Sequence, residues 1–148
     1  NSGALLWGYT YQISTINAYA NNVESLPSND GFYIAGYVIN EYKISAMVMN
    51  IDVFGMLTSI NILENNDGHV QANGLAVDPN SGDAIIAGMT FTNTNNIVNA
   101  LITRLTSNAN SIAWGKVFST GTKDQFQDLR LLDNSVFVIG HSGGFGDK

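Results

Sequence analysis

The chain has 148 residues, enough for one domain with a sizeable core, and 45% of them are apolar. Only 12% are charged, about half the usual share, which argues against a disordered or strongly solvated protein. The net charge of −6 and six scattered cations argue against nucleic-acid binding, and no apolar run is long enough to predict a membrane span.

Short apolar or alternating runs, separated by clusters of Gly, Asn, Asp and Ser, predict an all-β chain. Helical periodicity is absent, and Glu, Lys and Arg are scarce. Asn, which suits tight turns, occurs 19 times. The pattern predicts eleven strands, near residues 4–11, 20–26, 31–39, 44–52, 57–63, 71–77, 83–91, 98–106, 111–118, 125–132 and 135–141.

An apolar-apolar-Gly triplet recurs at a spacing of 52 residues, ending at Gly36, Gly88 and Gly140. Turn-forming residues precede each triplet, and a second apolar segment follows the first two, at 45–52 and 99–106. The Trp-Gly pairs that begin at Trp7 and Trp114 lie in similar segments, whereas the middle copy, 57–62, lacks them. These features predict a β-repeat of about four strands in a single domain, with repeats at approximately 4–56, 57–110 and 111–148.

The repeated glycines and tryptophans are interpreted as structural positions. A glycine inside an apolar strand weakens the strand unless something approaches closely. We expect an aromatic side chain or a neighbouring sheet to lie against Gly36, Gly88 and Gly140. Trp7 and Trp114 would fill the gap between sheets, so core packing is favoured over ligand stacking for both.

Three segments resemble the SBBP-type (bacterial-type) β-propeller repeat family. Residues 1–7 resemble its Gly-to-Trp segment, residues 74–90 its central turn-and-strand motif, and residues 99–105 the strand that follows. The match is strongest in the middle repeat, and the chain departs from the pattern at 23–27 and 126–130. The resemblance implies propeller-like four-stranded antiparallel blades and an extracellular or cell-surface setting, and it implies no shared catalytic residues.

A closed propeller needs at least four blades, and 148 residues give about 2.8 repeats of 52. The chain is therefore expected to be part of a longer protein, to close by association, or to stack its repeats openly. The start at Asn1 lacks an initiator Met and a signal-peptide pattern, which suggests a processed start or an excised fragment. Incomplete blades at both ends would leave open strand edges that can pair with another chain.

Candidate polar sites are each explained better by turns and loops. Residues 78–83 carry alternate oxygen ligands, but Gly82 stands in the wrong place for a calcium loop, so a hairpin turn is favoured. Asp67-Gly68 likewise signals a hairpin. Neither His69 nor His141 has a second His at ligand spacing, so no metal site is predicted.

No catalytic residue and no cofactor are predicted. His141 and Ser142 lie near Asp147 in sequence, but a Gly-rich tail does not preorganise a nucleophile, and no Gly-x-Ser-x-Gly motif is present. Cysteine is absent, which excludes thiol catalysis, disulfides and Cys-ligated zinc. Paired carboxylates of a glycoside hydrolase would have to come from among Asp124, Asp128 and Glu24, and nothing in the sequence singles them out.

Tyrosines concentrate in the first repeat, at positions 9, 11, 33, 37 and 42. Packing on a sheet face is the favoured interpretation, and Tyr37 and Tyr42 are the candidates for facing a ligand such as a glycan. The function expected is a non-catalytic extracellular structural or interaction module that self-assembles into a filament or surface layer through edge strands, or associates with other surface proteins. The alternatives are a carbohydrate-binding (lectin-like) domain and a fragment of a propeller hydrolase or lyase.

Overall fold

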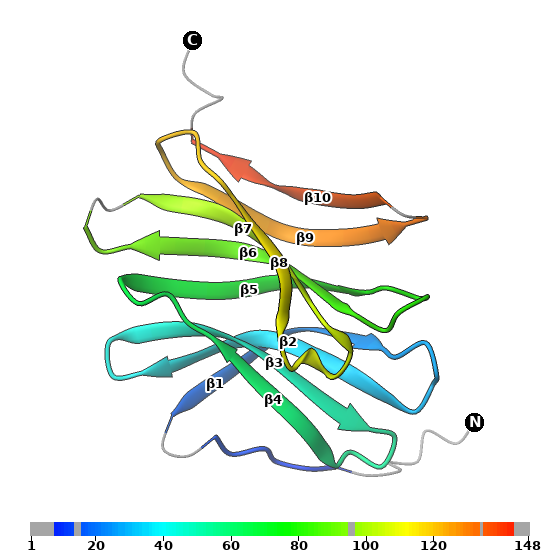
Figure 1. Ribbon diagram of the computed structural model, residues 1–148. Coiled ribbons are helices and arrows are strands. Elements are labelled where there is room, and N and C mark those ends of the chain that lie inside the picture. Colours follow the sequence, from blue (N-terminus) through cyan, green and yellow to red (C-terminus); the bar gives the residue numbers. More distant parts are fainter. Residues whose placement is uncertain (1–7, 14–15, 95–96, 134, 144–148) are drawn as a thin grey trace.

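The computed structural model describes residues 8–13, 16–94, 97–133 and 135–143, and the chain forms three antiparallel sheets stacked one on another (Figure 1). The first sheet has the order β1-β2-β3-β4, the second β5-β6-β7-β8, and the third holds β9 and β10. The strands are β1 (Asn17–Ser25), β2 (Gly31–Asn40), β3 (Lys43–Asp52), β4 (Leu57–Leu63), β5 (Gly68–Val77), β6 (Ala84–Thr92), β7 (Val98–Leu105), β8 (Ile112–Phe118), β9 (Asp124–Leu132) and β10 (Ser135–Ser142). A short 3-10 turn, η1 (Ser107–Ala109), precedes β8.

Ten of the eleven predicted strands are confirmed, and their grouping into four, four and two follows from the pairing. The strand predicted at 4–11 is wrong in its described part, because residues 8–11 are outside any strand. Tyr11 of this segment, with Ile13 just after it, instead packs on an apolar cluster of the β1–β4 sheet, and the Tyr11 hydroxyl donates to the Gly55 carbonyl. Residues 1–7, with Trp7, lie outside the described residues.

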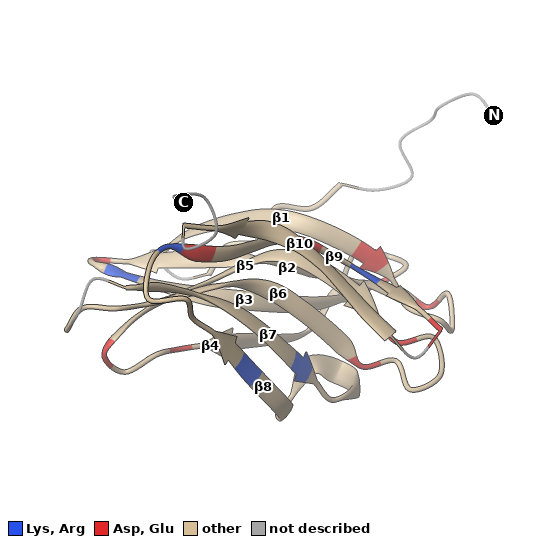
Figure 2. Ribbon diagram, turned by 90° about the horizontal axis from the view of Figure 1, so that it is seen from above, with Lys and Arg blue, Asp and Glu red and all other residues tan. Residues whose placement is uncertain are grey.

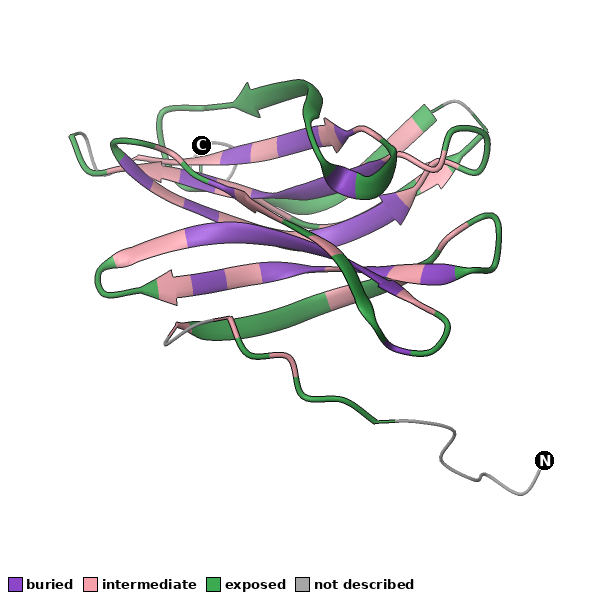
Figure 3. Cartoon of the chain, turned by 60° about the horizontal axis from the view of Figure 1, so that its bottom comes forward, coloured by how far each residue is buried: buried purple, intermediate pink, exposed green. Residues whose placement is uncertain are grey.

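The core consists of layers between the sheets (Figure 3, buried segments in purple). Strand β5 contacts β1, β2 and β3 of the preceding sheet, and β9 contacts β5, β6 and β7. Between the β1–β4 and β5–β8 sheets lie Tyr33, Ala35, Ala46, Val48, Leu63, Val70, Ala72, Leu75, Ala84, Ile86, Leu105 and Ala109. Between the β5–β8 and β9–β10 sheets lie Ala76, Ile85, Ala87, Ile102 and Leu129, with Phe126, Leu131, Val136 and Val138 packed against them.

The repeated glycines are required by the backbone of the preceding strand in the same sheet. Gly36, Gly88 and Gly140 each lie beside a β-bulge, where the register shifts by one residue. A Cβ on each would lie 1.9–2.0 Å from the carbonyl oxygens of Tyr19, Gln71 and Gln125, respectively. The expected cause, an aromatic side chain or a neighbouring sheet, is therefore wrong: the close approach comes from within the sheet.

Trp114 does not fill a gap between sheets. It lies on β8 opposite Arg104 and is 37% exposed, and every residue of β8 is exposed. The interpretation of Trp114 as a core residue is therefore wrong, because β8 is the outer edge strand of its sheet.

The turn at Asp67-Gly68 is present, but it is not a hairpin. It connects β4 to β5, which belong to different sheets. Asn65 shapes this connection, because its side-chain oxygen accepts from the Asp67 N–H at 3.2 Å.

The structure confirms an all-β fold with antiparallel four-stranded sheets. The described sheets do not close into a ring. The propeller arrangement, the number of blades, the repeat period and the division into repeats stay predictions.

Candidate interaction surfaces

Two strands make up the third sheet in the described part of the chain. Strand β10 pairs with β9, and within the described part of the chain no strand pairs with its other edge. In the first two sheets the corresponding strands, β2 and β6, each pair on that side with a further strand, β3 and β7. Because unpaired N–H and C=O groups accept a strand from another chain, the β10 edge is a candidate interaction surface.

The outer face of the β9–β10 sheet carries exposed apolar side chains. Phe137 and Ile139 are 55% and 66% exposed, although the corresponding residues Ile85 and Ala87 of β6 are buried. Phe137 and Ile139 alternate in the sequence with Val136 and Val138, which pack on the β5–β8 sheet. This alternation of apolar residues indicates that both faces of β10 are apolar.

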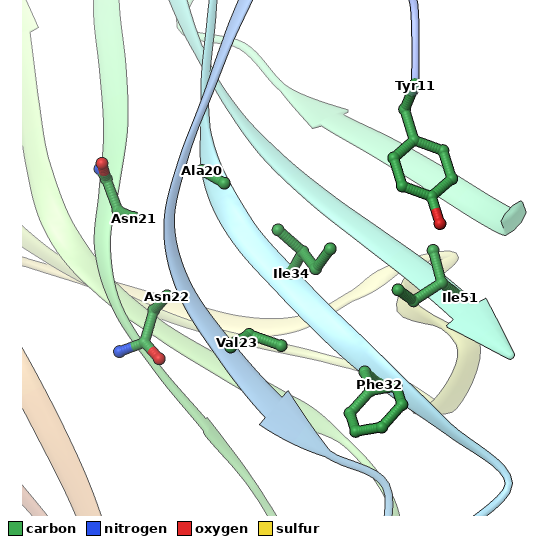
Figure 4. A pocket seen from close by; sticks show the side chains of 8 residues that line it. All are labelled: Tyr11, Ala20, Asn21, Asn22, Val23, Phe32, Ile34 and Ile51. Carbon is green, nitrogen blue, oxygen red and sulfur yellow. The ribbon is translucent and has the colours of Figure 1, made fainter. Parts of the chain in front are cut away.

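The opposite end of the stack, the outer face of the β1–β4 sheet, is also apolar. A hollow of about 660 Å³ lies there, lined by Tyr11, Ala20, Asn21, Asn22, Val23, Phe32, Ile34 and Ile51 (Figure 4). Figure 4 shows that Val23, Phe32, Ile34 and Ile51 come from three neighbouring strands and gather on one face. Sequence reasoning singled out none of these side chains, although their alternation along β2 was visible.

Two bulge asparagines connect neighbouring sheets. The Asn21 side chain in β1 donates from Nδ2 to the Ala72 carbonyl in β5 at 2.7 Å, and the Asn73 side chain in β5 donates to the Phe126 carbonyl in β9 at 2.8 Å. Both are the extra residue of a bulge. The sequence held a signal for this pair, because both are Asn at a spacing of 52 residues.

The two ligand candidates Tyr37 and Tyr42 differ in their surroundings. Tyr37 lies in β2 and stacks on Tyr19 of β1, with ring centroids 4.9 Å apart, whereas Tyr42 lies in the β2–β3 turn and is 93% exposed. Tyr33 is buried, and its hydroxyl accepts from the Asn108 N–H at 2.8 Å. No described contact joins Tyr37 to Tyr42.

The acidic turn at 78–83 is built around Arg104. The guanidinium donates to Asp78 at 2.7 Å and to Asp83 at 2.8 Å, so a side-chain cation lies among these oxygens, in the turn between β5 and β6 that the sequence favoured over a calcium loop. The hydrogen bond from the Asn80 N–H, together with the positive charge of Arg104, lowers the pKa of Asp78, and the pKa of Arg104 is raised chiefly by its hydrogen bond to Asp83. Gly82, with φ of +75°, completes the turn.

The hydrogen-bonded cluster at the end of β10 is centred on Asp124. Ser142 donates its hydroxyl proton to Asp124, and Thr120 donates to the same carboxylate at 2.8 Å. These hydrogen bonds, that of Ser142 first, lower the pKa of Asp124. Because Ser142 donates directly to a carboxylate, this contact does not activate it through a histidine base. Asp147 lies outside the described residues.

The remaining polar candidates are paired as well. Glu24 and Asp128 both contact Arg130, at 3.9 and 3.3 Å. The Nδ1 atom of His69 accepts from the Ile44 N–H at 3.0 Å, and its ring stacks on Phe91. Across the residues described, no group of three or more His, Asp or Glu side chains is arranged to hold a metal ion.

The surface has few charges, and they are scattered over edges and loops rather than gathered on one face (Figure 2). None of the described segments is a helix of the length and apolar character needed to cross a membrane. In comparisons with known proteins, neither a family model nor a curated protein matches this chain.

Proposed function

We propose that this chain is a non-catalytic structural or interaction module of propeller-type β-repeats, which self-associates through an open strand edge into a filament or surface layer. The edge is that of β10. Other surface proteins that offer a strand are the alternative partners, and the extracellular or cell-surface setting follows from the family resemblance.

The observation that carries the proposal is the outer edge of β10, with which no strand pairs among the residues that the structure describes. Native edge strands are commonly protected by charge, by proline or by a covering segment. Strand β10 has none of Asp, Glu, Lys, Arg or Pro in its sequence, and its exposed residues include Phe137 and Ile139. An added strand would satisfy the backbone groups of this edge, as β7 does for β6.

The propeller-type arrangement is supported by the recurring contact between successive sheets. Strand β5 lies across β1, β2 and β3 of the sheet before it, and β9 lies across β5, β6 and β7. Propeller blades are likewise antiparallel sheets of four strands, each packed on the next.

A non-catalytic role is supported by the polar clusters. Ser142 is held by Asp124, the acidic turn by Arg104, and Glu24 with Asp128 by Arg130. Each cluster joins segments of the fold.

The test is competition for the β10 edge. A synthetic peptide with the β7 sequence, Val98–Leu105, should add beside β10 as β7 adds beside β6. The assembly state of the purified chain is measured by light scattering and electron microscopy across concentrations from about 1 μM to 1 mM, with and without the peptide. Backbone amide exchange of β10 is followed in parallel, with a scrambled peptide as the control.

If the edge associates, the chain forms concentration-dependent assemblies, the β10 amides become protected, and the β7 peptide reduces assembly while the scrambled peptide has no effect. A chain that remains monomeric throughout, or assemblies in which β10 amides exchange as fast as in the monomer, would contradict the proposal.

Carbohydrate binding is the second candidate function. It is favoured by Tyr42, whose side chain is almost fully exposed to solvent. Exposed aromatic faces are suited to stacking on apolar faces of ligands. A glycan array probed with the wild-type chain and with Tyr42→Ala is the test. Binding lost in Tyr42→Ala supports this function, and no binding by the wild-type chain contradicts it. Because Tyr42 packs little, the variant should fold normally.

A further inference from the structure

The two junctions between sheets in this chain are built alike. At the first, Tyr33 and Ala35 of β2 pack on the β5–β8 sheet. At the second, Ile85 and Ala87 of β6 pack on the β9–β10 sheet. These residues correspond by position, since each set lies on the same side of the glycine of its triplet, Gly36 or Gly88. The same face of successive sheets therefore covers the next sheet.

The hydrogen bond across each junction is also the same. The side chain of the bulge residue donates to the carbonyl of the residue that precedes the bulge in the next sheet: Asn21 to Ala72, and Asn73 to Phe126. The third bulge residue is Gln127, since Asp128 and Phe126 pair with consecutive residues of β10. Gln127 is an exposed amide at the position that acts as donor in the other two sheets.

As far as the described residues go, the β9–β10 sheet thus carries an uncovered copy of the covering face. We define this covering face by Phe137, Ile139 and Gln127. Phe137 and Ile139 correspond to Ile85 and Ala87, which are 1% exposed, and they are themselves 55% and 66% exposed.

The β1–β4 sheet carries the complementary receiving face. On the β5–β8 sheet, the side chains that receive the preceding sheet include Ala72, Leu75, Ala84, Ile86 and Leu105. Within that sheet, Ala72 lies opposite Gly88, Leu75 lies opposite Ile86, and Ala84 lies opposite Leu105. The same register positions in the β1–β4 sheet are occupied by Ala20, Val23, Phe32, Ile34 and Ile51.

These five residues are the ones that line the hollow on the outer face of the β1–β4 sheet, together with Tyr11, Asn21 and Asn22 (Figure 4). Within the described part of the chain, the hollow is therefore a receiving face on which no sheet lies, and Tyr11 and Ile13 of the N-terminal segment pack on the adjoining apolar cluster. In the other two sheets, the acceptor is the carbonyl of the residue before the bulge, Ala72 or Phe126. The corresponding carbonyl at the hollow is that of Ala20.

We propose that the covering face of one molecule packs on the receiving face of a second copy, with the Gln127 amide donating to the Ala20 carbonyl. This head-to-tail contact rests on the self-association in the proposed function, and it replaces the route through the β10 edge with one through sheet faces. Because the two faces differ, the interface is heterologous, and successive copies extend the stack.

A second copy is the occupant because both halves of the contact are present in this chain, and both match an interface that the chain already forms twice. Tyr11 lies at the rim of the hollow and its hydroxyl is held by Gly55, so it borders the site where Phe137 of the second copy would pack.

The test uses one substitution on each face. Phe137→Lys changes the covering face, and Val23→Lys changes the receiving face. Both side chains are more than half exposed, so both variants should fold, which circular dichroism and thermal unfolding verify. The matched control is Phe54→Lys, because Phe54 is 70% exposed in the β3–β4 loop and belongs to neither face.

The assembly state is measured by analytical ultracentrifugation. Each face variant alone should lose association by at least about thirtyfold, as for a central interface residue, while Phe54→Lys should associate as the wild type does. Gln127→Ala should weaken association by about five- to tenfold, the effect of one hydrogen bond.

Mixing the two face variants gives the sharpest result. Phe137→Lys keeps an intact receiving face and Val23→Lys keeps an intact covering face, so an equimolar mixture should form dimers and nothing larger. Interfaces in which the same patch meets itself, or edges that pair, do not produce this behaviour.

The outcomes separate this inference from the proposed function. Assembly that persists in both face variants but is reduced by the β7 peptide overturns the face contact and leaves the edge association standing. Assembly lost in both variants, restored as dimers in the mixture and unaffected by the peptide supports the face contact and contradicts the edge. A wild-type chain that stays monomeric at about 1 mM overturns both.

Discussion

The bulge residue Asn73 gives a quantitative prediction about how the sheets are held together. Its side chain donates to the Phe126 carbonyl at 2.8 Å and accepts from Gln71 Nε2 at 2.9 Å. In Asn73→Ala both bonds are lost and the partly buried Phe126 carbonyl loses its donor. A hydrogen bond contributes about 0.5–1.5 kcal/mol, and an unsatisfied buried group costs about 1–3 kcal/mol. We expect the free energy of unfolding to fall by about 2 kcal/mol.

The measurement is urea unfolding followed by tryptophan fluorescence, with the slope of the transition checked against the wild type. For a chain of this length the midpoint of thermal unfolding should fall by about 4–8 °C. Gln127→Ala is the control, because this exposed amide lies at the same bulge position of the last sheet. At concentrations where the chain is monomeric, its effect should be below about 0.5 kcal/mol. Equal effects of the two substitutions would refute the bridging role of the bulge amide.

Two further predictions concern the backbone and the acidic turn. Gly88→Ala should lower the free energy of unfolding by about 3 kcal/mol, or fold poorly, because its Cβ would lie 1.9 Å from a carbonyl oxygen. The control is Gly115→Ala, whose Cβ would meet a side-chain oxygen at 3.2 Å. In a urea titration the control should change the free energy of unfolding by less than about 1 kcal/mol. The folded-state pKa of Asp78 is lowered, so its ionised form stabilises the fold above the unfolded pKa of about 3.9, and this stability is lost as pH falls through the folded pKa. Asp78→Asn should therefore be less stable than the wild type at pH 7 and should lose less stability on acidification to about pH 2, as measured by thermal unfolding across pH. A wild-type and variant difference that stays constant with pH would contradict this assignment.

Much of the local structure could be predicted from the sequence, because the period of two in apolar residues is a property of each segment alone. The alternation along β2 and the turn residues before it place that strand within one residue of its observed bounds. The recurrence of Gly36 and Gly88 also indicated equivalent positions. In the structure each lies opposite the residue that precedes the bulge, Ala20 or Ala72.

The physical reason for those glycines could not be found from the sequence. A recurring glycine indicates that another group lies too close for a side chain, but it does not indicate which group. In the fold the neighbour is a backbone carbonyl of the adjacent strand, which any residue type would supply. The residues 8–11 were misassigned for a related reason: alternation makes a segment capable of pairing, and only the presence of a partner strand makes it pair.

The candidate surfaces depend most on tertiary structure. By sequence, Phe137 resembles Ile85, since each follows a turn and precedes a glycine on its strand. Ile85 is buried because a third sheet covers it, and Phe137 is exposed because, within the described chain, no further sheet lies beyond β9 and β10. The sequence by itself determined strands, turns and their recurrence, which arise from local periodicity. Tertiary structure alone decided which faces are covered and which are open, because burial depends on where each sheet stands in the stack.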